Sequence, residues 1–121
     1  EINEQTLVVV MLESPQALDN ADAITAVDGI DVLLIGTNDL CAELGIPDQF
    51  GHQRVSEAYR VMIEACRKHG KFAGMAGVAD DALQQRYVDM GTQFLLADRD
   101  LRLMMDAGKR RADFLRTLNG S

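Results

Sequence analysis

Short apolar runs alternate with helix-like segments along the whole chain, and this alternation constrains the fold more than any other feature. The runs that we expect to form strands cover residues 6–12, 31–35, 71–78 and 92–97. The segments that we expect to form helices cover residues 14–24, 54–68, 81–90 and 101–118. The first run, TLVVVML, lacks polar alternation, as expected for a parallel strand that is covered on both faces. Strands alternating with helices predict an α/β fold with a parallel sheet and right-handed crossovers.

Residues that start and stop helices support these boundaries. Ser14 is a typical N-cap, and Pro15 suits the first helical position. Asp80 is placed to cap the start of the helix at 81–90. Gly70 is placed to end the helix at 54–68, and Gly91 is placed to end the helix at 81–90.

Two architectures contain such units: a doubly wound sheet, and part of a (βα)8 barrel. Four units with their loops on one side fit half a barrel. An isolated half would expose two sheet edges, so missing residues or another chain would have to complete it. The chain starts with Glu1 and a strand follows almost at once, so we expect it to be cut from a longer protein.

Composition restricts the partners. The chain has 121 residues, 47% of them hydrophobic, and a formal net charge of −7. This acidic balance argues against nucleic acid or an anionic membrane as a partner. No apolar stretch approaches the ~20 residues that span a bilayer. The two cysteines form no disulfide framework, so a reduced, cytoplasmic setting is expected.

Two carboxylates follow consecutive predicted strands. Glu13 comes directly after the first strand, and Asp39 comes a few residues after the second. Neighbouring strands lie about 4.8 Å apart, so both side chains can reach one point at the carboxyl edge of the sheet. Paired carboxylates with only oxygen donors select hard ions such as Mg²⁺ or Mn²⁺. Two structural alternatives remain open: Glu13 in the first turn of its helix, and Asp39 as the N-cap of a turn at residues 40–44.

The turn GTND between the second strand and Asp39 adds a candidate anion site. Gly36 allows close backbone approach. The N–H groups of Thr37, Asn38 and Asp39 can form a concave nest for a substrate carboxylate.

The segments VVVMLESPQAL and GIDVLLIGTNDLCAELGIPDQFGH together resemble the HpcH/HpaI aldolase/citrate lyase family, the metal-dependent class II pyruvate aldolases. The resemblance extends in order over essentially the whole chain. It implies a TIM-type (βα)8 barrel in which this chain supplies strands five to eight. Residues 1–121 would then be one (βα)4 half-barrel region of a single larger aldolase domain.

The resemblance also implies site residues. Glu13 and Asp39 would bind a divalent ion, Mg²⁺ or Mn²⁺, with Co²⁺ or Zn²⁺ as further candidates. Gly36, Thr37, Asn38 and Asp39 would bind the carboxylate of pyruvate. The metal-bound pyruvate enolate would add to an aldehyde or form in the reverse cleavage. The family's histidine base and enolate-stabilising arginine come from the first half of the barrel, so the catalytic residues are not expected in this chain. The family motif GPAD is GTND here.

The remaining reactive residues fit structural roles better. His52, at a helix start, is weighed as a base but suits a cap, and His69 suits the C-terminal end of a helix. Cys41 and Cys66 resemble small buried hydrophobes. The methionine-rich segment 101–108 is expected in the core or in a subunit interface. Members of the family form oligomers in which a terminal helix packs on a neighbouring subunit.

The expected function is therefore that of a metal-dependent aldolase, a carbon–carbon lyase acting on 2-keto acids, of which this chain carries the metal ligands but not the proton-transfer residues. The fragment alone is expected to be weakly active or inactive. Two alternatives stay open. One is a catalytically incomplete (βα)4 module that assembles and binds metal, and the other is an acyl-CoA lyase of the same superfamily.

Overall fold

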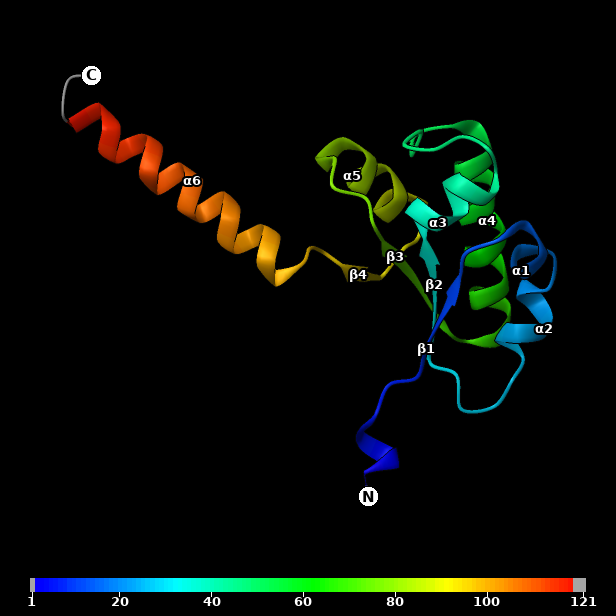
Figure 1. Ribbon diagram of the computed structural model, residues 1–121. Helices are drawn as coiled ribbons and strands as arrows, with labels where there is room; N and C mark the ends of the chain where they lie inside the picture. Colours follow the sequence, from blue (N-terminus) through cyan, green and yellow to red (C-terminus); the bar gives the residue numbers. More distant parts are fainter. Residues whose placement is uncertain (1, 119–121) are drawn as a thin grey trace.

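The computed structural model describes residues 2–118 and contains one sheet of four parallel strands (Figure 1). The strands are β1 (Val9–Leu12), β2 (Val32–Gly36), β3 (Phe72–Ala76) and β4 (Phe94–Leu96). Each strand pairs in parallel with the next one along the chain, giving the order β1-β2-β3-β4. A doubly wound sheet reverses its strand order at a switch point, and the described residues contain no such reversal. The arrangement is that of one arc of a barrel.

The helices follow the strands as the alternation predicts. They are η1 (Asn3–Gln5, a 3₁₀ turn), α1 (Pro15–Asp19), α2 (Ala21–Thr25), α3 (Thr37–Glu43), α4 (Gln53–His69), α5 (Asp81–Met90) and α6 (Asp100–Leu118). Ser14 Oγ accepts from the Ala17 N–H at 3.2 Å, and Asp80 Oδ1 accepts from the Leu83 N–H at 2.9 Å. Gly70 ends α4 with a φ of 66°. These caps confirm the predicted helix boundaries.

Three boundaries differ from the sequence expectation. The first helix is two helices, because Asn20 has a non-helical ψ of 7° and its side chain donates to the Gln16 carbonyl at 2.7 Å. The first strand starts at Val9 rather than at residue 6, since residues 3–5 form the 3₁₀ turn. The loop expected after β2 begins with helix α3.

The core lies between one face of the sheet and the helices. Leu12, Leu33, Ile35, Ala73 and Met75 project from this face into the same cluster as the buried side chains of α4. Within that cluster Tyr59 of α4 stacks on Tyr87 of α5, with ring centroids 3.9 Å apart. Helix α4 is thereby fixed against both the sheet and α5.

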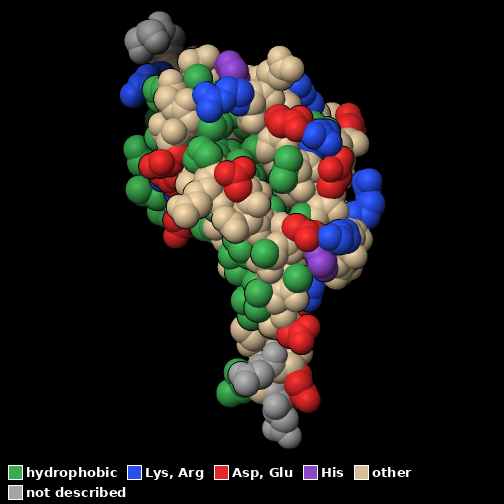
Figure 2. Space-filling model, turned by 90° about the vertical axis from the view of Figure 1, so that its right-hand side faces the viewer, with side chains coloured by type: hydrophobic (Ala, Val, Ile, Leu, Met, Phe, Trp, Pro, Cys, Tyr) green, Lys and Arg blue, Asp and Glu red, His purple; other side chains and the backbone are tan. Residues whose placement is uncertain are grey.

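The other face of the sheet is apolar and only partly covered: Val32 and Leu34 of β2 are buried on it, at 1% and 0% exposed, whereas side chains of the flanking strands are exposed. Val9, Met11, Phe72 and Leu96 share this face by strand alternation and register. Their exposed fractions are 37%, 45%, 52% and 51%. Hydrophobic side chains also gather along one edge of the space-filling view and along the narrow N-terminal segment (Figure 2), where Ile2, Leu7 and Val8 are exposed.

Helix α6 projects away from the sheet (Figure 1) and has no buried residue. Leu101, Met104 and Met105 are 66%, 70% and 67% exposed. Of the two places expected for segment 101–108, the core is therefore excluded among the described residues, and a subunit interface stays a prediction. Among the described residues, no helix combines the length and the apolar character needed to cross a membrane. The polar tail 119–121 lies outside the described residues.

Candidate active site at the carboxyl ends of β1 and β2

Glu13 and Asp39 leave the sheet at the same edge. Leu12 pairs in register with Ile35, so β1 and β2 end side by side. Glu13 follows β1 directly and precedes the N-cap Ser14, so it does not lie in the first turn of α1. Asp39 lies in the first turn of α3, whose N-cap is Gly36. Both structural alternatives raised from the sequence are therefore wrong, and neither carboxylate caps a helix.

The two carboxyl groups interact directly. Partial burial raises the pKa of Glu13 above its usual value, and the negative charge of Asp39 and a hydrogen bond with the Asp39 side chain raise it further. Glu13 is half-buried, whereas Asp39 is exposed. Two carboxyl groups this close disfavour the state in which both are ionised. The structure thus brings together the two candidate ligands, and the site faces solvent.

Gly36 makes room for Glu13. A Cβ atom on Gly36 would lie 2.5 Å from Glu13 Oε1 and 2.8 Å from its Cγ. The φ of Gly36 is −79°, which any residue can adopt, so the requirement for glycine is one of space. The space beside Gly36 is occupied by the Glu13 side chain, and the predicted close approach of a ligand to its backbone stays a prediction.

Thr37 anchors the start of α3. Its side chain is fully buried, and its Oγ1 donates to the Ala76 carbonyl at 2.7 Å. The Tyr59 hydroxyl lies 2.8 Å from the same Oγ1 and must donate to it, since the threonine proton is already used. Burial raises the pKa of Tyr59, which keeps its hydroxyl protonated. The Thr37 side chain therefore faces the core, and its backbone N–H is the group that it can offer to the site.

Asn38 lies against the loop that follows β3. A Cβ atom on Gly77 would be 2.5 Å from Asn38 Nδ2, and Gly77 has a φ of +82°. Beside this contact is a cavity of about 560 Å³ that reaches from Asn38 and Gly77 to Leu96 and Arg99. The exposed residue Asn38 thus lines an open space at the ends of β3 and β4 and is the chain neighbour of Asp39.

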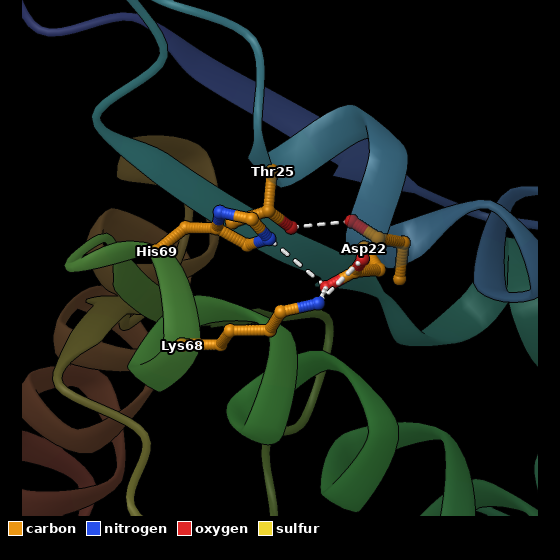
Figure 3. Close-up of polar contacts among 5 residues, drawn as sticks. Asp22, Thr25, Lys68 and His69 are labelled. Atoms are coloured by element: carbon orange, nitrogen blue, oxygen red, sulfur yellow. Dashed lines mark hydrogen bonds and ion pairs between the residues drawn. The ribbon is translucent and has the colours of Figure 1, made fainter.

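The other candidate residues have separate partners. His52 caps α4, with Nδ1 accepting from the Arg54 N–H at 3.1 Å. His69 lies at the opposite end of α4, where its Nε2 is 2.9 Å from an oxygen of Asp22 (Figure 3). Burial raises the thiol pKa of Cys41 and of Cys66. No group of three or more His, Cys, Asp or Glu side chains among the described residues could hold a metal ion, so Glu13 and Asp39 stand as a pair.

The contacts that hold Thr37 and Asn38 in place could not be predicted from the sequence. The Thr37–Tyr59 hydrogen bond joins residues far apart in the chain, and no local pattern marks it. Asn38 and Gly77 are likewise far apart in the chain. The only local signal for their contact is weak: a glycine close to the end of a predicted strand suggests a close backbone approach.

Comparison with known proteins agrees with this architecture. The family model of the HpcH/HpaI aldolase/citrate lyase family matches residues 1–107. The chain belongs to this family. Among solved structures, the HpcH/HpaI aldolase from Desulfitobacterium hafniense DCB-2 superposes with a TM-score of 0.81 at 28% identity, over 94% of this chain and 44% of that one.

Curated members of the family are similar over most of the chain. A 2-keto-3-deoxy-L-rhamnonate aldolase from Escherichia coli O6:K15:H31 is 41% identical over 121 residues, which is 99% of this chain and 45% of the relative. A 4-hydroxy-4-methyl-2-oxoglutarate aldolase from Hapsidospora irregularis is 37% identical over 99 residues, 80% of this chain and 37% of the relative. The chain thus spans less than half the length of these relatives.

Proposed function

We propose that this chain is the metal-binding part of a class II aldolase that forms or cleaves the aldol of a 2-keto acid and an aldehyde. The observation that carries the proposal is the convergence of Glu13 and Asp39 at the carboxyl ends of adjacent parallel strands. Both curated relatives described above are aldolases whose names specify a 2-keto or 2-oxo acid. Pyruvate, the smallest keto acid that forms such an enolate, is the proposed nucleophilic substrate.

The donor set fits a divalent cation. Burial raises the pKa of Glu13 most, and the charge of the neighbouring Asp39 raises it further; a divalent ion bound by both carboxylates would relieve this repulsion. All-oxygen donors with solvent on one side suit Mg²⁺ or Mn²⁺, which keep positions for water and substrate. When bound, such an ion would supply Lewis-acid polarisation of the keto-acid carbonyl.

The residues of GTND would position the keto acid. Backbone N–H groups in the first turn of a helix lack intrahelical acceptors, and those of Thr37, Asn38 and Asp39 occupy this position in α3. Gly36 leaves the space in which the Glu13 carboxylate lies. The buried Thr37 side chain fixes the orientation of this turn, so the N–H groups are held before a substrate carboxylate arrives.

The proton-transfer groups are proposed to come from outside this chain. His52 uses its Nδ1 as a helix cap, and His69 pairs with Asp22 at the far end of α4. We propose that residues 1–121 form the second half of a barrel, part of one larger aldolase domain whose other half carries the base and the arginine. The exposed apolar side chains Val9, Met11 and Phe72 on one face of the sheet fit a surface that the other half would cover.

Helix α6 is proposed to pack on a neighbouring subunit of a homo-oligomer. Leu101, Met104, Met105 and Leu115 follow helical spacing along one stripe, and all are exposed. Met105→Glu should shift the protein to a smaller species in analytical ultracentrifugation. Leu103→Glu, which changes an exposed leucine on the opposite side of the helix, is the matched control and should leave the species unchanged.

Metal titration tests the proposed site. Glu13→Gln and Asp39→Asn should each weaken Mn²⁺ binding, measured by calorimetry, by about tenfold or more, because each removes one anionic donor. Glu43→Gln, at the other end of α3, is the control and should bind as the wild type does. Unchanged affinity in both site variants would refute the metal assignment.

A second measurement separates an aldolase from a module that only assembles and binds metal. Exchange of the pyruvate methyl protons with D₂O, followed by NMR, reports enolate formation. With the protein at its natural length, metal-dependent exchange supports the aldolase. Metal binding without exchange would favour the module.

A further inference from the structure

The amino-terminal edge of the sheet, opposite Glu13 and Asp39, contains a cavity with two basic side chains in its lining. It has a volume of about 340 Å³ and lies between the last turn of α4, the start of β3, the end of α5 and the start of β4. Its polar lining includes Arg67, Lys71, Thr92 and Gln93. No Asp or Glu side chain lines it.

The Thr92 hydroxyl is buried in this lining without a partner. Thr92 is 3% exposed, and its Oγ1 has no hydrogen-bond partner among the described residues. Its backbone N–H is satisfied, since it donates to the Tyr87 carbonyl at 3.1 Å. Buried hydroxyl groups in folded proteins almost always have a hydrogen-bond partner. The unpartnered Thr92 hydroxyl therefore points to a bound group that supplies this hydrogen bond.

Arg67 and Lys71 bring positive charge to the same cavity. Neighbouring Lys68 and His69 both contact Asp22 (Figure 3), whereas Arg67 and Lys71 make no ion pair with any described residue. Arg67 Nη2 would lie 3.7 Å from a Cβ on Gly91, the residue before Thr92, which places the guanidinium group beside the start of β4.

We propose that this cavity binds a small oxyanion, the phosphate or carboxylate group of a metabolite, between Arg67, Lys71 and the Thr92 hydroxyl. Two cations and a hydroxyl donor match the acceptor oxygens of such a group. The protein has a net charge of −7, whereas the lining of this cavity has two cationic side chains and no carboxylate. The site is separate from the proposed metal centre and does not depend on it.

Binding is tested on the protein at its natural length with inorganic phosphate and with succinate, each at constant ionic strength and without divalent ions. Calorimetry should show saturable binding of at least one of the two anions, and the bound anion should raise the melting temperature because it binds the folded state. Phosphate alone identifies a phosphorylated ligand, and succinate alone identifies a carboxylate. The absence of saturable binding for both, or an equal effect of chloride, overturns the proposal.

Variants locate the binding. Arg67→Gln and Lys71→Gln should each weaken the anion affinity roughly tenfold, because each removes a charged donor. Thr92→Val keeps the shape of the side chain. It should raise the melting temperature of the anion-free chain while weakening anion binding. Arg110→Gln, an exposed change of equal charge on α6, should have no effect, and binding that survives in both Arg67→Gln and Lys71→Gln refutes the site. Asp39→Asn should bind the anion normally, which separates this test from that of the metal centre.

Discussion

The carboxylate of Glu13 lies over the backbone of Gly36, which belongs to the neighbouring strand. A Cβ atom on Gly36 would stand 2.5 Å from Glu13 Oε1, closer than these atoms can pack. The glycine therefore helps to define the site although it has no side chain of its own. The φ of Gly36 is one that any residue can adopt. The need for glycine therefore becomes apparent only from the position of the Glu13 side chain.

Gly36→Ala should displace Glu13 and weaken Mn²⁺ binding by about tenfold, because one of two anionic donors would leave its position. Calorimetric titration measures the affinity, and circular dichroism checks that the fold is kept. The matched control is Gly108→Ala in α6, where a Cβ atom would meet nothing within 4 Å. Normal metal affinity in Gly36→Ala would show that the position of Glu13 is not part of metal binding.

Glu13→Gln should stabilise the metal-free protein at neutral pH. Burial and Asp39 raise the pKa of Glu13 in the folded state, so ionisation there is costlier than in the unfolded chain. A raised carboxyl pKa means that stability is lost as the pH rises through the folded-state value. Because Glu13 is partly exposed, the gain at pH 7 should stay below about 1 kcal/mol.

Urea unfolding in the presence of EDTA measures this gain. The difference between Glu13→Gln and the wild type should shrink at about pH 3.5, where glutamate is protonated in both states. A variant that is less stable than the wild type at both pH values would contradict the repulsion between Glu13 and Asp39.

Thr37→Val should destabilise the fold by about 1–3 kcal/mol, because the buried Tyr59 hydroxyl and the Ala76 carbonyl both lose a partner. Tyr59→Phe removes only one of these bonds and should cost about 1 kcal/mol. Urea unfolding of both single variants and of the double variant measures the coupling. Strictly additive effects would show that the two side chains do not act together.

Asp22→Asn should lower the melting temperature near neutral pH and make it less sensitive to acid. Hydrogen bonds from Lys68 and His69 lower the pKa of Asp22, so its stabilising contribution is present above the ordinary aspartate pKa and is lost as the pH falls through the folded-state value. Melting curves between neutral pH and about pH 3 test this. Asp28→Asn, an exposed change nearby at a residue without a side-chain hydrogen bond or ion pair among the described residues, should follow the wild type.

Local sequence patterns predict most of the strands and helices and several of the helix ends. Ser14, Asp80 and Gly70 mark helix ends through their own side chains or backbone, so their roles can be read from sequence. The meeting of Glu13 with Asp39 was also predictable, since parallel strands that follow each other end at one edge. The metal and substrate roles of these residues stay predictions.

Contacts between distant segments were not predictable. Helix α3 starts without a side-chain cap, so nothing in GTND distinguishes it from a loop. Thr37 is small and polar, and only the positions of Tyr59 and Ala76 decide that its hydroxyl is buried. The apolar stripe of α6 predicts burial but does not identify the surface that covers it, so the sequence left the core and a subunit interface as alternatives for segment 101–108, and the structure excludes only the core.

The strand order described above has an evolutionary consequence. Glu13 and Asp39 sit within one β-α-β unit, joined by the local pairing of β1 with β2. A recombination event that exchanged the rest of the gene could therefore replace the residues around a second reactant while passing on both acidic positions intact. Related proteins could thus change their substrate specificity while keeping both Glu13 and Asp39.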